Sequence, residues 1–571
     1  MTVSMKHSGD SGDNIFPSEF PARRGFSISY RGKTLLSKID PVAQGERLAA
    51  EIPVKAGTLY FCPSPLYGYG LSILLEKLEP NSAVICVEAD KKLFDISRKA
   101  LGKNTAIFSL LNTSKAEELC ALVRKTYGER SFRRVEEIRL TAGWQLFPQL
   151  YEELAKALRQ DITLEWSNAI TLIHLGRLYA RNLIRNLPLL PESENITALN
   201  FPCPALTLGA GPSLDSILEE LSALWRGKIP GPEERPFKIV CADTCLPALI
   251  ERQILPDLVV ILESQHWNLR AFTGSRGLKI DTAIDLSALP ASCRVLTGKR
   301  YFFATQWVNL ALITRLNNAG ILPEVFAPLG SVGLNTVALA LRTGCAYVIT
   351  GGLDFSYSLD AYHCRSSPGY LALQLGQNRF RSLINAGIAL REGSFVILSK
   401  TGKQIRSNPI MRNYRDIFEQ EFGGNTRLLD ISASGLPLGI KTVSPGEAFN
   451  ILNETDKKTN TPSVSQSGAT NFNPQREKIT AFIRKEIDTL NNIENMLTGL
   501  IPPDLTCLEE LLDTADYLWA HFPECAGAGG RRPSAADLSF LKRVRAEIEP
   551  FRKLWEMSAD ILSAEEVSSL R

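Results

Sequence analysis

Near the middle of the chain, a strand, a glycine-rich loop and a helix start follow one another in Leu206-Thr207-Leu208-Gly209-Ala210-Gly211-Pro212-Ser213-Leu214. Gly209 and Gly211 lack side chains, so the backbone can turn sharply there and approach a ligand closely. Pro212 suits a first helical turn, and Ser213 could cap the helix or bind a ligand oxygen. Free N–H groups at such a helix start favour an anion such as phosphate, although a tight structural turn explains the spacing equally well.

Acidic residues follow three further predicted strands around this loop. They are Asp243 after residues 238–241, Glu263 after residues 258–262, and Asp354 after residues 346–350 and the pair Gly351-Gly352. Each acid alone is explained by a helix cap or a surface charge. Because ligands of open parallel sheets bind outside the carboxyl ends of the strands, their joint recurrence predicts one shared crevice. The loop Gly330-Ser331-Val332-Gly333 could add backbone donors to it.

The 571 residues exceed what one hydrophobic core supports, and the pattern predicts an α/β protein of several domains. Strands at residues 58–62, 83–88 and 138–140, with helices between them, predict a parallel N-terminal unit that helical residues 149–158 and 169–187 connect to the centre. We expect a flexible arm over residues 1–25 and a Rossmann-like domain over 26–190. A central α/β domain over 191–453, a polar linker over 454–476 and a helical domain over 477–571 complete the expected order.

The helical domain is expected from an apolar stripe at three- and four-residue spacing. The stripe is typical of a helix packed into a core, and it contains Ile479, Ile483, Leu490 and Ile493.

Composition excludes several classes of function. The 64 basic and 61 acidic residues leave a net charge of +3, which gives no electrostatic argument for nucleic acid or a membrane surface. The 11 cysteines are scattered without CxxC spacing, so we expect free thiols. Neither a secretory h-region nor a run of about 20 apolar residues is present, and we expect a soluble, cytoplasmic protein without membrane or nucleic-acid partners.

Four segments together resemble the central domain of the motility accessory factor (Maf) proteins, bacterial flagellin glycosyltransferases of nonulosonic acids. The segments are Leu208–Leu214, Ala242-Asp243 with Leu255–Val260, Gly330-Ser331-Val332, and Gly351-Gly352-Leu353-Asp354-Phe355. The same domain is shared with 6-hydroxymethylpterin diphosphokinases of the MptE-like type, and the first and fourth segments also resemble motifs of bacterial sialyltransferases. Residues 428–439 are similar to a Maf segment before its last helix. The resemblance spans residues 55–450.

The resemblance implies a sialyltransferase-like central domain that binds a CMP-nonulosonate donor, with flagellin as acceptor. Gly209, Gly211, Pro212 and Ser213 would then hold the nucleotide, with Asp243 beside its ribose or base. The nucleotide pocket would also include Gly330, Ser331 and Gly352. Tyr357 or Tyr362 would bind the leaving phosphate, and Asp354 and His363, one of five histidines, would complete the catalytic set, with His363 as the base. In the sialyltransferases the base lies further from the motif at Asp354.

Two alternatives remain open from the sequence. One is an enzyme similar to the pterin diphosphokinases, in which Asp243, Glu263 or Asp354 holds Mg²⁺ between the phosphates of ATP. The other is a flagellar accessory or scaffold protein without catalytic activity. The N-terminal segment Tyr67-Gly68-Tyr69-Gly70, followed by Glu88, resembles a degenerate methyltransferase fingerprint, and no ligand of that domain is assigned.

Overall fold

The computed structural model describes residues 16–128, 130–225, 228–305, 310–357, 362–380, 382, 393–453, 476–500, 504–526 and 532–569. Contacts divide the chain into two compact units, Met1–Gly176 with Trp519–Asp537 (unit 1) and Arg177–Leu518 with Leu538–Arg571 (unit 2). Within the described residues, no helix is both long enough and apolar enough to cross a membrane. The linker expected at 454–476 lies outside the described residues, except for Arg476.

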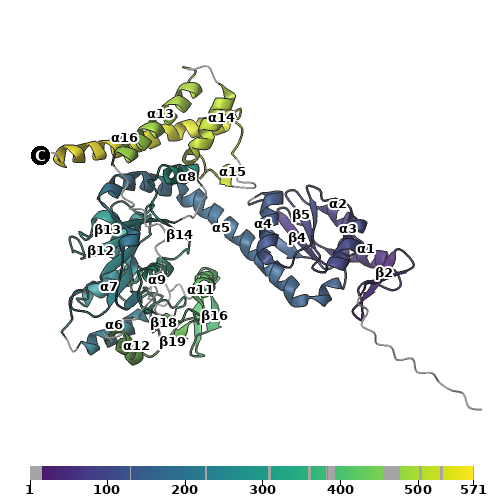
Figure 1. The fold of residues 1–571 in the computed structure, drawn as a ribbon, viewed down its shortest axis with the longest axis horizontal. Coiled ribbons are helices and arrows are strands. Elements are labelled where there is room, and N and C mark those ends of the chain that lie inside the picture. The colour runs from purple at the N-terminus through teal and green to yellow at the C-terminus, as the bar shows by residue number, and fades with distance from the viewer. Residues whose placement is uncertain are drawn as a thin grey trace, which may run out of the picture. The chain divides into compact units, whose positions relative to one another are not determined.

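Unit 1 is built on a four-stranded parallel sheet. Its elements are β1 (Ser18–Pro21), β2 (Phe26–Tyr30), β3 (Lys33–Thr34), α1 (Pro41–Glu51), β4 (Thr58–Pro63), α2 (Leu71–Lys77), β5 (Ala83–Val87), α3 (Lys91–Leu101), β6 (Phe108–Leu111), α4 (Ala116–Tyr127), β7 (Arg134–Glu137), η1 (Gly143–Leu146), the first part of α5 (Pro148–Asn186) and α15 (Pro523–Ala526). The strand order is β6-β5-β4-β7 (Figure 1). Helices α4 and α5 pack on one face, and α1 and α2 on the other. The antiparallel strands β1, β2 and β3 form a separate small sheet.

Unit 2 contains a longer parallel sheet. Its elements are η2 (Leu187–Glu192), β8 (Glu194–Asn195), η3 (Ile196–Ala198), β9 (Ala205–Leu208), α6 (Leu214–Leu224), β10 (Lys238–Ala242), η4 (Asp243–Cys245), α7 (Leu246–Glu251), β11 (Leu258–Ile261), η5 (His266–Phe272), β12 (Asp281–Asp285), η6 (Ser292–Arg294), β13 (Arg300–Thr305), α8 (Ala311–Asn318), β14 (Val325–Phe326), α9 (Val332–Arg342), β15 (Val348–Gly351), α10 (Pro368–Leu375), β16 (Phe395–Leu398), β17 (Gln404–Ser407), α11 (Pro409–Phe422), β18 (Leu428–Asp430), β19 (Lys441–Thr442), α12 (Pro445–Asn453), α13 (Arg476–Leu497), α14 (Leu505–Thr514), η8 (Asp516–Leu518) and α16 (Leu538–Ser569).

The order of the strands in this sheet is β14-β13-β12-β11-β10-β9-β15-β18-β19, and β8 pairs with β13. Side chains of α9 and α11 share one apolar cluster with the sheet, and α6 and α7 cover the opposite face in Figure 1. Strands β9 and β11 are fully buried, and β10 is buried except at Lys238, which is why they read as short, continuous apolar runs in the sequence.

The C-terminal helices α13, α14 and α16 belong to the same unit as this sheet. The predicted stripe is confirmed as core, because Ile479, Ile483, Leu490 and Ile493 of α13 are fully buried. A buried carboxylate, Glu486, accepts hydrogen bonds from Arg315 of α8 (3.2 Å) and from the Tyr517 hydroxyl (3.3 Å). The helical tail therefore packs on α8 through charged groups as well as apolar ones.

The mixed α/β class expected from the sequence is confirmed, and three local expectations differ from the structure. Residues 18–21, expected in a flexible arm, form β1 and pair with β2. The strand expected at 138–140 lies earlier, at β7, because this edge strand alternates polar and apolar residues and buries only Val135. The two helical stretches at 149–158 and 169–187 are one helix, α5, because no proline interrupts them.

Candidate functional site

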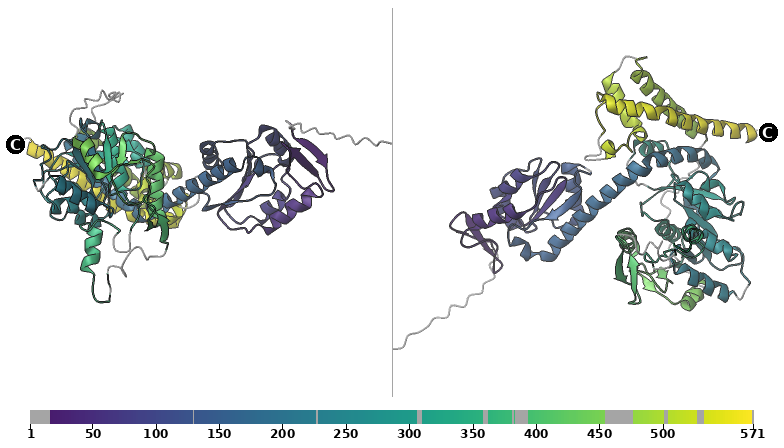
Figure 2. Two further views of the ribbon diagram at one scale, coloured as in Figure 1. Left: turned by 90° about the horizontal axis from the view of Figure 1, so that it is seen from below. Right: turned by 180° about the vertical axis from the view of Figure 1, so that it is seen from behind.

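The order of the strands along the central sheet reverses at β9. The chain proceeds from β9 to β10 and β11 on one side of β9, whereas the later strands β15 and β18 lie on its other side. Figure 2 shows this sheet, drawn in teal to green, from two further directions. Leu208, the last residue of β9, lies opposite Gly351 at the end of β15. Such a switch point is where open parallel sheets bind ligands. It brings together the glycine loop at 209–213 and the segment at 351–354, as the sequence predicts.

Glycines let these two loops pack backbone against backbone. The N–H of Gly209 donates to the carbonyl of Gly351, and that of Gly211 to the carbonyl of Gly352, both at 2.8 Å. A Cβ on Gly352, whose φ is +73°, would lie 2.1 Å from the Gly209 carbonyl oxygen. These two N–H groups therefore hold the neighbouring loop, so the donors predicted for a phosphate are already used by the protein.

Asp354 holds the glycine loop through hydrogen bonds to Ser213. Its Oδ2 accepts hydrogen bonds from the backbone N–H and the hydroxyl of Ser213, both at 2.9 Å, and its Oδ1 accepts one from the Ser434 hydroxyl at 3.1 Å. Burial raises the pKa of Asp354 to about 6, although the hydrogen bonds from Ser213 lower it. The carboxylate thus lies at the start of α6, where an external anion was expected, and acts as a clamp between loops.

His363 contacts the glycine loop through its ring. Its Nδ1 lies 3.0 Å from the carbonyl oxygen of Ala210, and the N–H of Cys364 donates to the same oxygen at 2.9 Å. A carbonyl only accepts, so this bond places the proton on Nδ1 and leaves Nε2 with a free lone pair. Burial lowers the pKa of His363 below its ordinary value. The geometry therefore provides a neutral imidazole with one basic nitrogen at the switch point.

The two candidate tyrosines have different surroundings. The ring of Tyr362 meets that of His363 edge-on, with centroids 4.6 Å apart. Tyr357 is buried, its N–H donates to the Arg406 carbonyl at 2.9 Å, and its hydroxyl has no partner within the described residues. Tyr362 is thus the tyrosine beside the candidate base, and Tyr357 is fixed by its backbone.

Asp243 lies at the end of β10, next to β9. One oxygen accepts hydrogen bonds from the N–H (2.7 Å) and hydroxyl (3.0 Å) of Thr244. The other, Oδ2, is buried and has no hydrogen-bond partner among the described residues. Burial raises the pKa of Asp243 to about 6. The buried side-chain amide of Asn268 adjoins this carboxylate and lowers its pKa, so Oδ2 is an acceptor that a hydroxyl or amino group of a ligand would share with Asn268.

The start of α9 borders the same loops. A Cβ on Gly333 and one on Gly209 would each lie 2.5 Å from the same methyl group of Leu353. Ser331 precedes α9 with extended backbone and makes no side-chain cap hydrogen bond. Gly330 has a φ of +73° and abuts the ring of Tyr414. Within the described part of the chain, no carboxylate binds the side chain of the serine before α9, whereas Asp354 binds the serine before α6.

Sequence reasoning missed the loop after β18. Ser432 accepts the N–H of Gly352 at 3.1 Å, and Ser434 binds Asp354. Lys400 pairs with Asp430 and donates to the Ser432 carbonyl at 3.1 Å, which anchors the loop. Residues 428–439 were recognised as a family-like segment, but nothing in their spacing identified which serines face Asp354. Glu263, the third predicted acid, is exposed, and its carboxylate accepts the N–H of Gln265 at 2.9 Å.

Comparisons with known proteins identify the family and the fold of this chain. Residues 181–360 match the family model described as 6-hydroxymethylpterin diphosphokinase MptE-like. An uncharacterized protein of Treponema pallidum (strain Nichols) is 30% identical over 574 residues, which cover 96% of each chain. The solved structure of a Maf glycosyltransferase from Magnetospirillum magneticum AMB-1 is 14% identical with a TM-score of 0.50, covering 95% of this chain and 89% of that one. This chain therefore belongs to one family with the Treponema protein, and it carries the MptE-like domain within a Maf-type fold.

Proposed function

We propose that this protein is a glycosyltransferase that moves a nonulosonic acid from a CMP-sugar to a serine or threonine hydroxyl of flagellin, and so supports flagellar assembly and motility. The observation that carries the proposal is His363 at the switch point of a Maf-type fold, because its Nδ1 is held by the Ala210 carbonyl and its Nε2 has no hydrogen-bond partner among the described residues. A transferase of this kind needs a base beside a nucleotide site, and both belong at that position.

In the proposed reaction, Nε2 of His363 accepts the proton of the acceptor hydroxyl as its oxygen attacks the anomeric carbon of the donor. The bond from that carbon to the phosphate oxygen breaks, and CMP leaves with the bonding electrons. A base with a depressed pKa is unprotonated at neutral pH, so it is ready without a prior proton loss. Asp354 is a positioning residue here, because its oxygens hold Ser213 and Ser434.

Donor binding is assigned to Asp243, the start of α9 and Tyr362. Oδ2 of Asp243 would accept a ribose hydroxyl or a base amino group. The α9 start at Gly330 and Ser331 would receive the phosphate, because its N–H groups and dipole favour negative charge. Tyr362 would donate to the leaving phosphate, where charge develops in the transition state.

The test uses purified full-length chain, a CMP-nonulosonate and recombinant flagellin, with intact mass as readout. We expect a mass gain of one sugar per modified site with the wild type and none with His363→Ala. The matched control is His174→Ala, which changes an exposed histidine of α5. A wild type that is inactive with competent substrates, or a His363→Ala variant as active as His174→Ala, contradicts the proposal.

The family model supports a second candidate, a diphosphokinase that uses ATP and Mg²⁺. Among the described residues, no three or more His, Cys, Asp or Glu side chains cluster to hold a metal. Asp243 would supply one ligand oxygen, and the phosphates would supply others. Stabilisation by CMP in a thermal-shift experiment favours the transferase, whereas stabilisation only by ATP with Mg²⁺ favours the kinase.

A further inference from the structure

The parallel sheet of unit 1 has the order in which related folds bind an adenosine cofactor. In such sheets the cofactor crosses the carboxyl ends of the strands, and an acid after the second strand binds the two ribose hydroxyls. Glu88 occupies that position directly after β5, and the loop from Ser64 to Gly70 follows β4 where a phosphate loop would lie. S-Adenosylmethionine or a dinucleotide is thus the ligand that the fold suggests, and the contacts of these residues decide whether it fits.

The carboxylate of Glu88 is completely engaged by the protein. Its Oε2 accepts the Ser64 hydroxyl at 2.6 Å, and its Oε1 accepts the Tyr151 hydroxyl at 3.1 Å and the Asp90 N–H at 3.2 Å. Two protein hydroxyls therefore stand where the two ribose hydroxyls would bind. Glu88 is also fully buried, and each of its carboxylate oxygens already has a hydroxyl of the protein as partner.

The loop after β4 is also closed. The N–H of Gly68 donates to Pro65 at 2.8 Å, and that of Leu71, the first residue of α2, donates to Gly68 at 2.9 Å. Pro63 and Pro65 have no N–H to offer. Leu66 has a φ of +52° and is completely buried, so the loop turns inward instead of cradling a ligand.

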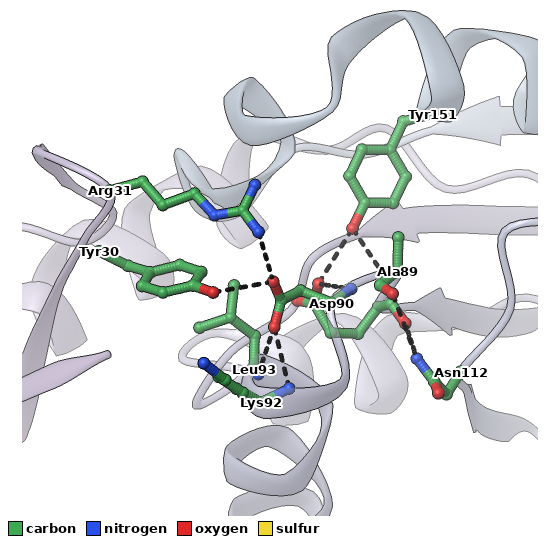
Figure 3. Close-up of polar contacts among 9 residues, drawn as sticks. Tyr30, Arg31, Ala89, Asp90, Lys92, Leu93, Asn112 and Tyr151 are labelled. Carbon is green, nitrogen blue, oxygen red and sulfur yellow. Dashed lines mark hydrogen bonds and ion pairs between the residues drawn. The ribbon is translucent and has the colours of Figure 1, made fainter. Parts of the chain in front are cut away.

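Strands β2 and β3 with the two residues after them (residues 26–36, here called the hairpin) cover the carboxyl ends of the strands in this sheet. Figure 3 shows Tyr30 and Arg31 directed at Asp90, the residue before α3, which they bind at 3.1 and 3.4 Å. Asp90 also caps α3, because its carboxylate accepts the N–H groups of Lys92 and Leu93. On the other side of the view in Figure 3, the Tyr151 hydroxyl accepts the N–H of Ala89, the residue before Asp90.

Apolar contacts complete the cover. Ile28, Leu35 and Leu36 of the hairpin pack with Leu66 and Leu93 in one buried cluster. The Leu35 carbonyl accepts the Ala142 N–H, beyond β7, at 2.9 Å. The hairpin thus touches segments beyond β4, β5 and β7.

A cavity of about 620 Å³ lies nearby, between the hairpin and α1. Neither Glu88 nor Ser64 lines this cavity, so it is separate from the cofactor position.

We infer that the hairpin is a built-in occupant of the cofactor position, and that unit 1 binds neither S-adenosylmethionine nor a dinucleotide. The Ser64 and Tyr151 hydroxyls replace the ribose, and the hairpin replaces the remainder of the ligand. The cofactor position of unit 1 is then closed, and this conclusion is independent of the activity proposed for unit 2.

The test titrates the full-length chain with S-adenosylmethionine, S-adenosylhomocysteine and NAD⁺ by calorimetry. Hydrogen exchange of residues 26–36 and 64–70 is followed in parallel. We expect no saturable binding at ligand concentrations up to about 1 mM, where even weak cofactor sites would respond, and unchanged exchange in both segments. Saturable binding that Glu88→Gln weakens at least tenfold, and that the exposed control Glu79→Gln leaves unchanged, overturns the inference. Binding that Glu88→Gln leaves unchanged, with no new protection in these segments, belongs to another site and supports it.

A second variant tests the hairpin itself. Asp90→Ala removes the acceptor of Tyr30 and Arg31, and we expect exchange at residues 26–36 to accelerate severalfold relative to Asp95→Ala, a change of a half-exposed α3 residue. Unchanged exchange in Asp90→Ala would show that the hairpin is not held on this edge and would overturn the assignment.

Discussion

The carboxylate of Asp354 binds one residue 141 positions earlier and another 80 positions later in the chain. Replacement by alanine would leave the N–H and hydroxyl of Ser213 buried without an acceptor. Each such unpaired group costs about 1–3 kcal/mol, so we expect Asp354→Ala to lower the free energy of unfolding by about 2 kcal/mol or more in urea titrations. Asp354→Asn keeps an oxygen for Ser213 and should lose less. If Asp354→Ala, Asp354→Asn and the exposed control Asp488→Ala all changed the free energy of unfolding equally, Asp354 would not hold the two loops together.

Asp243 gives a prediction about pH, also at the scale of one residue. Its pKa is raised from 3.8 to about 6 in the folded protein, so the folded state holds the proton more tightly than the unfolded state. Its stabilising contribution is present below about pH 4 and is lost as the pH rises through about 6, by about 3 kcal/mol. Asp243→Asn does not titrate. We therefore expect the stability of the wild type relative to this variant to fall between pH 4 and pH 7 in denaturant titrations, and a constant difference would contradict the buried ionisation.

At the scale of elements, the sequence predicts what short-range pattern encodes. Apolar runs identify β4, β5, β9, β10 and β11, and glycine followed by Pro212 and Ser213 marks the start of α6. The convergence of the strand ends follows from parallel pairing. The partner of Ser213 does not follow, because Asp354 reaches it only through the pairing of β9 with β15. The same limit explains why the serines after β18 were missed. It also explains why the polar strand β7 was predicted a few residues too late, at 138–140 instead of Arg134–Glu137.

The β9 and β15 loops yield a prediction about backbone packing. Gly352→Ala would combine a positive φ with a Cβ 2.1 Å from the Gly209 carbonyl oxygen. Gly402→Ala has a similar φ of +77° but nothing within 4 Å, so it isolates the conformational cost. We expect that cost to be about 1 kcal/mol for Gly402→Ala and clearly larger for Gly352→Ala, measured as free energy of unfolding. Equal losses in the two variants would mean that the loops separate easily.

At the scale of the molecule, helices α13, α14 and α16 of the tail are part of the compact unit that contains the central sheet. Asp516 accepts the N–H of Ala311 at 2.6 Å and so caps α8, while Arg315 of α8 pairs with buried Glu486. The Ser558 hydroxyl donates to the Ile184 carbonyl at 3.0 Å, which joins α16 to the end of α5. A tail attached by polar groups of this kind is expected to lose its structure together with the sheet that it covers.

This coupling can be measured with Glu486→Ala. The substitution leaves the guanidinium of Arg315 and the hydroxyl of Tyr517 without their shared acceptor, and breaking a buried ion pair costs about 3–5 kcal/mol. We expect hydrogen exchange to accelerate in α13 and, to a similar extent, in α8, because the two helices share the lost contacts. Glu477→Ala, on an exposed position of α13, should change neither. Faster exchange confined to α13 and α16, with α8 unchanged, would show that the tail unfolds independently. In that case the tail could be treated as a separate domain, which is the organisation that the sequence alone suggests.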